Sequence, residues 1–209
     1  MKGRYKIMGR LDGKVAIVTG SNSGVGAATA KLFAKEGAKV VISARRLPQL
    51  EEVAEQIRAE GGEVLIVQTD VSKVEDCENL VAKTVETFGK VDVLVNNAGV
   101  LEAGLKPIDC YEDEDLDYVL GINTKGTLYC TRAVLKDMIK NNSGSIINLD
   151  SVAGQFGTGV TNTVDTQLIV AVIYRNGASH LYNLVCFIFA MQIGAITPKF
   201  CIDFTVFIG

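Results

Sequence analysis

The sequence predicts a doubly wound α/β domain, in which helices cover both faces of a parallel sheet. Short apolar runs alternate with helical patterns five times between residues 14 and 149. The apolar runs show no polar alternation, which is typical of strands that are buried on both faces of a parallel sheet. The chain has 209 residues, enough for one domain with a substantial core.

Five short segments are expected to form the strands of this sheet. Each is rich in valine, isoleucine or leucine and is flanked by glycine or polar residues, as buried strands commonly are. The expected strands cover residues 14–19, 39–43, 64–69, 91–95 and 145–149.

Apolar residues at helical spacing follow the first four expected strands. The first helix is expected to present Ala28, Leu32 and Phe33 to the sheet and to end at Gly37. The apolar faces expected for the second and third helices are Leu50, Val53, Ala54 and Ile57, and Leu80, Val81, Val85 and Phe88.

Helix start signals refine these expectations. Pro48 stands near the start of the second helix, where its fixed φ is tolerated. Ser72 and Glu75 have the spacing of a capping box for the third helix. A longer helical stretch is expected over residues 113–140.

Composition and charge exclude several classes of protein. The net charge is -3 and the pI about 5.3, without the basic stripe that nucleic-acid binding would need. The five cysteines are widely spaced and form no CxxC pair, so we expect neither a disulfide framework nor a metal site. The N-terminus has no apolar stretch typical of a signal peptide. These features favour a cytoplasmic protein.

A glycine-rich segment, TGSNSGVG, connects the first strand to the first helix. Backbone N–H groups and the dipole at a helix N-terminus favour a phosphate there. Gly20 would allow the tight turn, Gly24 the close approach of a pyrophosphate, and Gly26 close packing of the helix on the sheet. The pattern alone also occurs in ordinary turns, but after the first strand of a βαβ unit it predicts dinucleotide binding.

The second strand ends in ISARR. An acidic residue at this place would bind the ribose hydroxyls of NAD, but Ser43 and Ala44 stand here, followed by Arg45 and Arg46. A guanidinium suits the 2'-phosphate of NADP. We therefore expect NADP to be preferred over NAD, the alternative being that the arginines form a solvated charged turn.

Two further motifs follow strands directly. TDVS places Asp70 and Val71 after the third strand, and NNAG occupies residues 96–99 after the fourth. Open α/β sheets bind ligands at the carboxyl ends of their strands. Both motifs are therefore expected to face the same ligand as the glycine-rich segment.

Together these motifs resemble the classical short-chain dehydrogenase/reductase family. TGxxxGxG, the Asp-Val pair, NNAG, the asparagine of GINTKG and SIINLDSVAG occur in the family's order and spacing over residues 9–157. The resemblance implies a Rossmann fold and an oxidoreductase that moves hydride between NAD(P) and a carbonyl or alcohol. The cofactor-binding positions are Gly20, Asn22, Ser23, Gly24, Val25, Gly26, Arg45, Asp70, Val71, Asn97, Ala98 and Gly99.

The resemblance also implies catalytic positions. Ser151 matches the serine that binds the substrate oxygen, and Asn123 the helix asparagine that holds a water chain to the catalytic lysine. The family's tyrosine and lysine fall at Val164 and Leu168, and neither side chain can transfer a proton. Two interpretations stay open: an oxidoreductase of this type, or an NAD(P)-binding protein without catalysis.

The composition changes near residue 160. Residues 160–209 carry four charged side chains, whereas the whole chain has 21 lysine and arginine and 24 aspartate and glutamate residues. Residues 176–198 carry none, but polar residues interrupt them, which makes membrane insertion the less favoured interpretation. We expect one domain over residues 1–209, with a dinucleotide-binding part at 9–157 and a divergent apolar tail at 158–209.

The tail raises a further hypothesis, namely that it arises from a shifted reading frame, a retained intron or a truncated gene. The expected partners are a small carbonyl or alcohol substrate and, by resemblance, other copies of the chain in a homo-oligomer. The pocket that would select the substrate falls after the fifth strand, so the sequence does not name the substrate.

Overall fold

The structure, a computed structural model, describes residues 9–101, 110–149, 174–175 and 182–183. Its centre is a five-stranded sheet in the order β3-β2-β1-β4-β5, and every neighbouring pair of strands is parallel. The strands are β1 (Val15–Thr19), β2 (Lys39–Ala44), β3 (Val64–Gln68), β4 (Val93–Asn96) and β5 (Ser145–Asn148). All five lie at the expected places, and the prediction of a doubly wound parallel sheet is confirmed.

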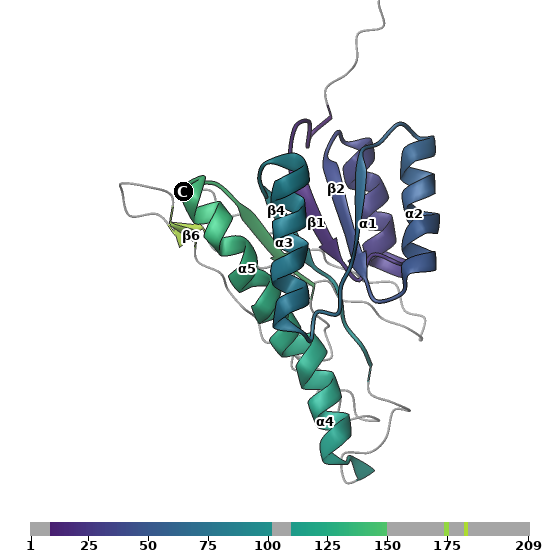
Figure 1. The fold of residues 1–209 in the computed structure, drawn as a ribbon, viewed down its shortest axis with the longest axis vertical. Helices are drawn as coiled ribbons and strands as arrows, with labels where there is room; N and C mark the ends of the chain where they lie inside the picture. The colour runs from purple at the N-terminus through teal and green to yellow at the C-terminus, as the bar shows by residue number, and fades with distance from the viewer. Residues whose placement is uncertain (1–8, 102–109, 150–173, 176–181, 184–209) are drawn as a thin grey trace, which may run out of the picture.

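Helices cover both faces of the sheet (Figure 1). The helices α1 and α2 lie on one face, and α3 and α5 lie on the other. Their bounds are α1 (Gly24–Lys35), α2 (Leu47–Ala59), α3 (Val74–Phe88), α4 (Asp113–Val119) and α5 (Thr127–Lys140). The chain therefore changes face after β3, so the strand order reverses between β1 and β4, where open sheets of this kind form a crevice.

The core is divided by the sheet into two layers. In β1, Ile17 packs with the α3 and α5 side, whereas Ala16 and Val18 pack with the α1 and α2 side. All five residues of β1 are buried. This explains why the strand has an unbroken apolar sequence, since its side chains point alternately into two apolar layers.

The expected face of the second helix is confirmed, because Leu50, Val53, Ala54 and Ile57 are all buried in α2. The expected face of the first helix is confirmed at Phe33, which is partly buried and packs against the core, and is wrong at Ala28 and Leu32, which are exposed. Leu32 of α1 is 55 % exposed, and the buried residues are Gly26, Ala27 and Ala30. The helix begins at Gly24, inside the glycine motif, and turns its small residues to the sheet so that its backbone approaches the strands closely.

The expected capping box at the third helix is also wrong. The N-cap of α3 is Lys73, and the Ser72 hydroxyl instead donates to a carboxylate oxygen of Asp70 at 2.7 Å. The Asp76 carboxylate accepts from the Asp70 backbone N–H at 2.8 Å. The polar residues of this segment therefore fix the turn after β3, where Asp70 lies, rather than the helix end.

The long helical stretch is confirmed over residues 113–140, but its middle is a π-helix, η2 (Leu120–Gly126), between α4 and α5. The α4 end extends away from the sheet (Figure 1). Inserted π turns of this kind often occur at functional sites, and this one contains Asn123.

In the tail, the two-residue strands β6 (Tyr174–Arg175) and β7 (Tyr182–Asn183) form an antiparallel pair. The rest of the expected tail, including residues 176–181 and 184–198 of the apolar segment, lies outside the described residues. Among the helices that the structure describes, none combines the length and apolarity needed to cross a membrane.

Candidate functional site

A cavity of about 320 Å³ opens at the carboxyl ends of the central strands. It lies at the point where the strand order reverses between β1 and β4, the place where open α/β sheets bind ligands. Its lining residues come from the ends of β1, β2, β3 and β4 and from η2. They are Gly20, Asn22, Ser23, Ala44, Arg45, Arg46, Thr69, Asp70, Val71, Asn97, Ala98, Gly99, Val100 and Ile122.

The turn after β1 requires glycine at position 20. Gly20 has φ +65°, and a Cβ there would lie 2.7 Å from the Cα of Ala98. The next residue ties the turn to β2, because the Ser21 hydroxyl accepts from the Ser43 N–H at 2.9 Å and donates to the Val18 carbonyl at 2.9 Å. The turn is therefore held against β2 and β4 at once.

The N-terminus of α1 is open toward the cavity. Its N-cap, Ser23, makes no capping hydrogen bond with its side chain, and the first turn holds no acidic residue. A Cβ on Gly24 would have no atom within 4 Å, whereas one on Gly26 would lie 2.6 Å from the Gly20 carbonyl oxygen. The helix end thus combines unshielded backbone N–H groups with space for an anion, and Gly26 lets it pack on the turn.

A cluster of hydrogen bonds around Thr19 and Asn97 joins the ends of β1 and β4. The Thr19 hydroxyl accepts from the N–H groups of Asn97 and Ala98, both at 3.0 Å, and donates to the Val95 carbonyl at 3.3 Å. In return, the Asn97 amide donates to the carbonyls of Thr19 at 2.9 Å and Gly20 at 3.1 Å. The Asn97 side chain therefore positions the glycine turn, although Asn97 also lines the cavity.

Replacing Thr19 by valine tests how much this hydrogen-bond cluster contributes to stability. Thr19→Val keeps the shape of the side chain but leaves the partly buried N–H groups of Asn97 and Ala98 without this acceptor. At about 1–3 kcal/mol for each of the two unsatisfied groups, we expect a loss of roughly 2–6 kcal/mol in the free energy of unfolding, measured by urea denaturation. Thr19→Ser keeps the hydroxyl and should lose much less. Equal losses in the two variants would contradict a role for the hydroxyl.

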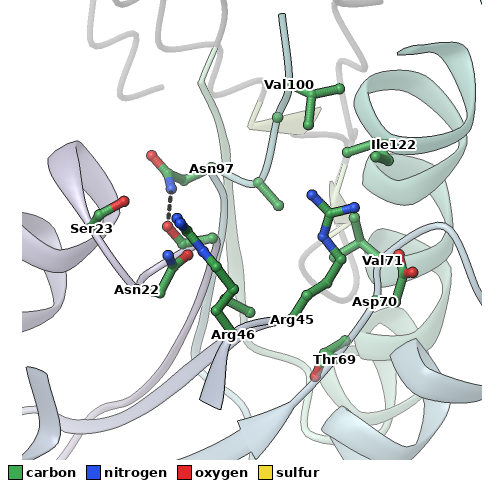
Figure 2. A pocket seen from close by; sticks show the side chains of 14 residues that line it. Asn22, Ser23, Arg45, Arg46, Thr69, Asp70, Val71, Asn97, Val100 and Ile122 are labelled. Atoms are coloured by element: carbon green, nitrogen blue, oxygen red, sulfur yellow. Dashed lines mark hydrogen bonds between the residues drawn. The ribbon is translucent and has the colours of Figure 1, made fainter. Parts of the chain in front are cut away.

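Two arginines reach the cavity from the end of β2 on different sides (Figure 2). Arg45 lies toward Val71, and its Nη2 donates to the Tyr118 hydroxyl at 3.5 Å. Arg46 lies beside Asn22, whose amide oxygen, turned toward it, accepts from Nη2 at 2.6 Å and from Nε at 3.2 Å. Both residues are exposed at the mouth of the cavity.

The surroundings of Arg45 favour its charged form. The hydrogen bond to Tyr118 is the largest effect and raises the pKa of Arg45 above its ordinary value. Burial opposes it, and the nearby Tyr118 and Asp70 raise the pKa further. The Arg45 backbone carbonyl also accepts from Nε2 of Gln68 at 2.8 Å. The residue thus offers a permanent positive charge on a backbone that is tied to β3.

The turn after β3 presents an acidic and an apolar residue side by side. The Asp70 carboxylate accepts from the N–H and the hydroxyl of Ser72 at 3.1 and 2.7 Å. Val71 is 7 % exposed and lines the cavity with Ile122 of η2. This side of the cavity offers apolar walls to a flat ring and a carboxylate at their edge.

Asn123 is buried behind the cavity and does not line it. Its side chain accepts from the Val100 N–H at 2.8 Å and donates to the Val100 carbonyl at 2.9 Å. The Thr127 hydroxyl donates to the Asn123 carbonyl at 2.9 Å. Asn123 therefore anchors the segment after β4 to the π-helix, and it carries Ile122 into the cavity wall.

Most of the expected site residues are brought together in one place. Nine line the cavity: Gly20, Asn22, Ser23, Arg45, Asp70, Val71, Asn97, Ala98 and Gly99. Gly24, Val25 and Gly26 lie outside the lining, in the first turn of α1. Ser151, Val164 and Leu168 lie outside the described residues.

The sequence interpretation missed several residues that shape the site. Thr19 and Ser21 stand inside the glycine motif and are buried. Their hydroxyls hold the turn against the neighbouring strands, a role that a motif centred on glycines does not indicate. Arg46 was expected only as a neighbour of Arg45. Val100 and Ile122 could have been found from their positions next to NNAG and Asn123.

Comparison with known proteins identifies the family of this chain. A family model described as short chain dehydrogenase matches residues 14–163. The chain belongs to the short-chain dehydrogenase family. The resemblance read from the motifs is thereby confirmed.

Single relatives are similar to the chain as well. The chain is 43 % identical over 141 residues to an uncharacterized oxidoreductase of Listeria monocytogenes, covering 68 % of this chain and 56 % of that protein. It therefore spans little more than half the length of this relative.

Solved structures share the fold. A metagenomic short-chain oxidoreductase in complex with NADP superposes with a TM-score of 0.69 at 34 % identity, covering 75 % of this chain and 70 % of that one. A NAD⁺-bound xylitol dehydrogenase superposes with a TM-score of 0.71 at 34 % identity, covering 76 % and 60 %. The described part of the chain thus has the fold of family members that bind either dinucleotide.

Proposed function

We propose that this protein is an oxidoreductase of the short-chain dehydrogenase type, which binds a nicotinamide dinucleotide and transfers hydride between it and a carbonyl or alcohol. The observation that carries the proposal is the cavity at the carboxyl ends of the strands, where the glycine turn, the α1 N-terminus and two arginines meet. When bound, the nicotinamide accepts or supplies the hydride.

The residues around the glycine turn fit the pyrophosphate of such a cofactor. The first turn of α1 is open and free of acidic side chains, so its N–H groups and dipole favour a negative group. The Ser23 hydroxyl, which caps nothing, is placed to donate to a phosphate oxygen. Gly24 gives the pyrophosphate room that a side chain would take.

The opposite side of the cavity fits the adenosine. We assign the adenine to the apolar wall formed by Val71 and Ile122, with Asp70 at its edge. Arg45 lies on the Val71 side and Arg46 on the Asn22 side. Both follow Ala44 at the end of β2, where no acidic residue stands to bind two ribose hydroxyls. Their charges support NADP as the preferred cofactor, with NAD as the weaker ligand.

The catalytic assignments follow the family pattern. Ser151 is proposed to hydrogen-bond the substrate oxygen, and Asn123 to be the helix asparagine that holds a water chain. The Asn123 side chain also positions the segment after β4 through its two hydrogen bonds to Val100. The sequence carries Val164 and Leu168 where the pattern has tyrosine and lysine. That observation keeps a second candidate function, a nucleotide-binding protein without turnover, which a kinetic measurement separates from the first.

Thermal melting of the purified chain with NADP, with NAD and without ligand tests the cofactor proposal. A ligand present at a hundred times its dissociation constant adds about 2.7 kcal/mol to the free energy of unfolding. We expect both ligands to raise the melting midpoint and NADP to raise it more at equal concentration. A cooperative melt that neither ligand shifts would reject the cofactor site.

Replacing Arg45 should change the choice of cofactor. A charge-assisted hydrogen bond contributes about 1.5–3 kcal/mol, so Arg45→Ala should weaken NADP binding by roughly 10- to 150-fold and change NAD binding little. Calorimetric titration of both cofactors measures the ratio. Arg46→Ala makes the same charge change on the Asn22 side of the cavity, so comparing the NADP-to-NAD affinity ratio of the two variants shows how much each guanidinium selects the cofactor. An equal loss of NADP and NAD affinity in Arg45→Ala would contradict the assignment.

The substrate and the assembly are also proposals. A small carbonyl or alcohol fits the family, and its chemical class is best found by a substrate screen with NADP and NADPH. Homo-oligomer formation is supported by Leu128 and Ile139 of α5, which are 38 % and 66 % exposed. Light scattering on the native protein measures the number of copies directly.

A further inference from the structure

Two buried thiols face each other next to the candidate site. Cys77 lies in the first turn of α3 and Cys130 in the first turn of α5, two helices that lie on the same face of the sheet (Figure 1). Their Sγ atoms are 3.4 Å apart, although 53 positions separate them in the chain. The two residues are 0 % and 1 % exposed. Both are free thiols in the structure.

The two thiols differ chemically because they share one hydrogen bond. Cys130 donates to Cys77, and this bond lowers the pKa of Cys77, against the opposing effect of burial. The same bond, together with burial, raises the pKa of Cys130. Since the thiolate is the nucleophile in thiol chemistry, these directions make Cys77 the expected nucleophile and Cys130 the expected resolving thiol.

We propose that Cys77 and Cys130 form a modification site, which a hydroperoxide converts reversibly into an intramolecular disulfide. A disulfide places its sulfurs about 2.0 Å apart, so the Sγ atoms, now at 3.4 Å, must approach by about 1.4 Å. Neither cysteine lines the cavity, so the proposal does not rest on the proposed function.

The reaction balances with hydrogen peroxide as the oxidant. The Cys77 thiolate attacks one oxygen, the O–O bond breaks, and hydroxide leaves and takes up the thiol proton as water. The resulting sulfenic acid is then attacked by the Cys130 sulfur, so that the S–S bond forms and the S–O bond breaks. A second water leaves with the Cys130 proton. The two thiols lose two electrons, and the peroxide is reduced to two waters.

The proposed disulfide would form next to the cavity, in contact with one of its lining residues. Cys77 Sγ lies 3.4 Å from the Val71 carbonyl oxygen and donates to it, and Val71 lines the cavity. The side chain of Val71 also packs against Gly126, at the junction of η2 and α5, where an added Cβ would lie 2.7 Å from its Cγ2. Disulfide formation removes the Cys77 hydrogen from this contact.

Mass spectrometry of the full chain tests the proposal. The other cysteines, Cys110, Cys186 and Cys201, are replaced by serine so that only the pair remains. The folded protein is treated with hydrogen peroxide below its melting midpoint, alkylated in denaturant and digested. We expect a loss of two hydrogens, no alkylation, a linked peptide containing positions 77 and 130, and two thiols restored by dithiothreitol.

Single variants in that background test the order of the two steps. Cys130→Ser should leave Cys77 as a sulfenic acid that dimedone traps, and Cys77→Ser should leave Cys130 reacting more slowly. Faster trapping at Cys130 would overturn the assignment of the nucleophile. Oxygen adducts without the linked peptide, or a disulfide that forms only in denaturant, would overturn the site itself. If a serine variant fails to fold, the peptide map of the protein that keeps both Cys77 and Cys130 still shows whether the disulfide forms in the folded state.

Discussion

Replacing Gly20 by alanine is expected to lower the free energy of unfolding by roughly 2–5 kcal/mol and to abolish NADP binding. The position has φ +65°, which costs an L-residue about 1–2 kcal/mol. The added Cβ would also lie 2.7 Å from the Cα of Ala98 and 3.0 Å from its nitrogen. Relieving an overpacked contact typically costs about 1–3 kcal/mol more, and here it must move backbone that lines the cavity.

Two other glycines separate these contributions. Gly13 has φ +73° and no atom within 4 Å of an added Cβ, so Gly13→Ala should show only the conformational cost and bind NADP normally. Gly24 has φ +56° and the same open space, but it begins α1 beside the cavity. Gly24→Ala should therefore lose about as much stability as Gly13→Ala and, unlike it, also lose affinity for NADP. Urea denaturation and calorimetric titration measure both quantities. Identical profiles for Gly20→Ala and Gly13→Ala would contradict the close approach of the two turns.

Turnover of the chain is expected to lie about 10²–10⁴-fold below that of a family member with tyrosine and lysine at the positions of Val164 and Leu168. This is the range that a positioned acid or base typically contributes. A valine side chain holds no proton to transfer, while the cofactor site formed by residues 9–149 does not depend on it. The prediction is therefore low kcat with ordinary affinity for NADPH, measured as NADPH oxidation in the presence of carbonyl substrates.

The comparison needs a relative assayed under the same conditions, such as a full-length short-chain dehydrogenase that reduces the same substrate. A kcat within tenfold of that relative would contradict the prediction and show that another group transfers the proton. The pH dependence of kcat would then give the pKa of that group. Removal of Ser151 as Ser151→Ala distinguishes turnover at the proposed site from background reduction.

The architecture could be predicted from the sequence because both of its signals are local. Unbroken apolar strands such as β1 arise where the side chains enter two apolar layers, and the α2 pattern from Leu50 to Ile57 repeats at helical spacing. The α1 face was predicted correctly only at Phe33. The buried Ala27 and Ala30 were missed because small residues carry little hydrophobic signal. The cap at Ser72 failed because Asp70 competes for the same hydroxyl.

The candidate site was predictable where glycine and charge mark it, and not where long-range hydrogen bonds build it. Gly20 and Arg45 stand out in the sequence, and both line the cavity. Thr19 and Asn97 are hydrogen-bonded across 78 positions of the chain, and the residues next to them in the sequence do not indicate this contact. The π-helix was also missed, although residues 120–126 contain two glycines and other weak helix formers that interrupt the helical pattern.

Calorimetric titration of the native chain with NADP tests the central claim most directly, since it reports both affinity and stoichiometry. We predict saturable binding of one NADP per chain, weakened by Arg45→Ala and lost in Gly20→Ala, with NAD binding less tightly. No saturable heat with NADP or NAD, from protein that melts cooperatively, would contradict the account. The cavity at the ends of β1 to β4 would then not be a dinucleotide site.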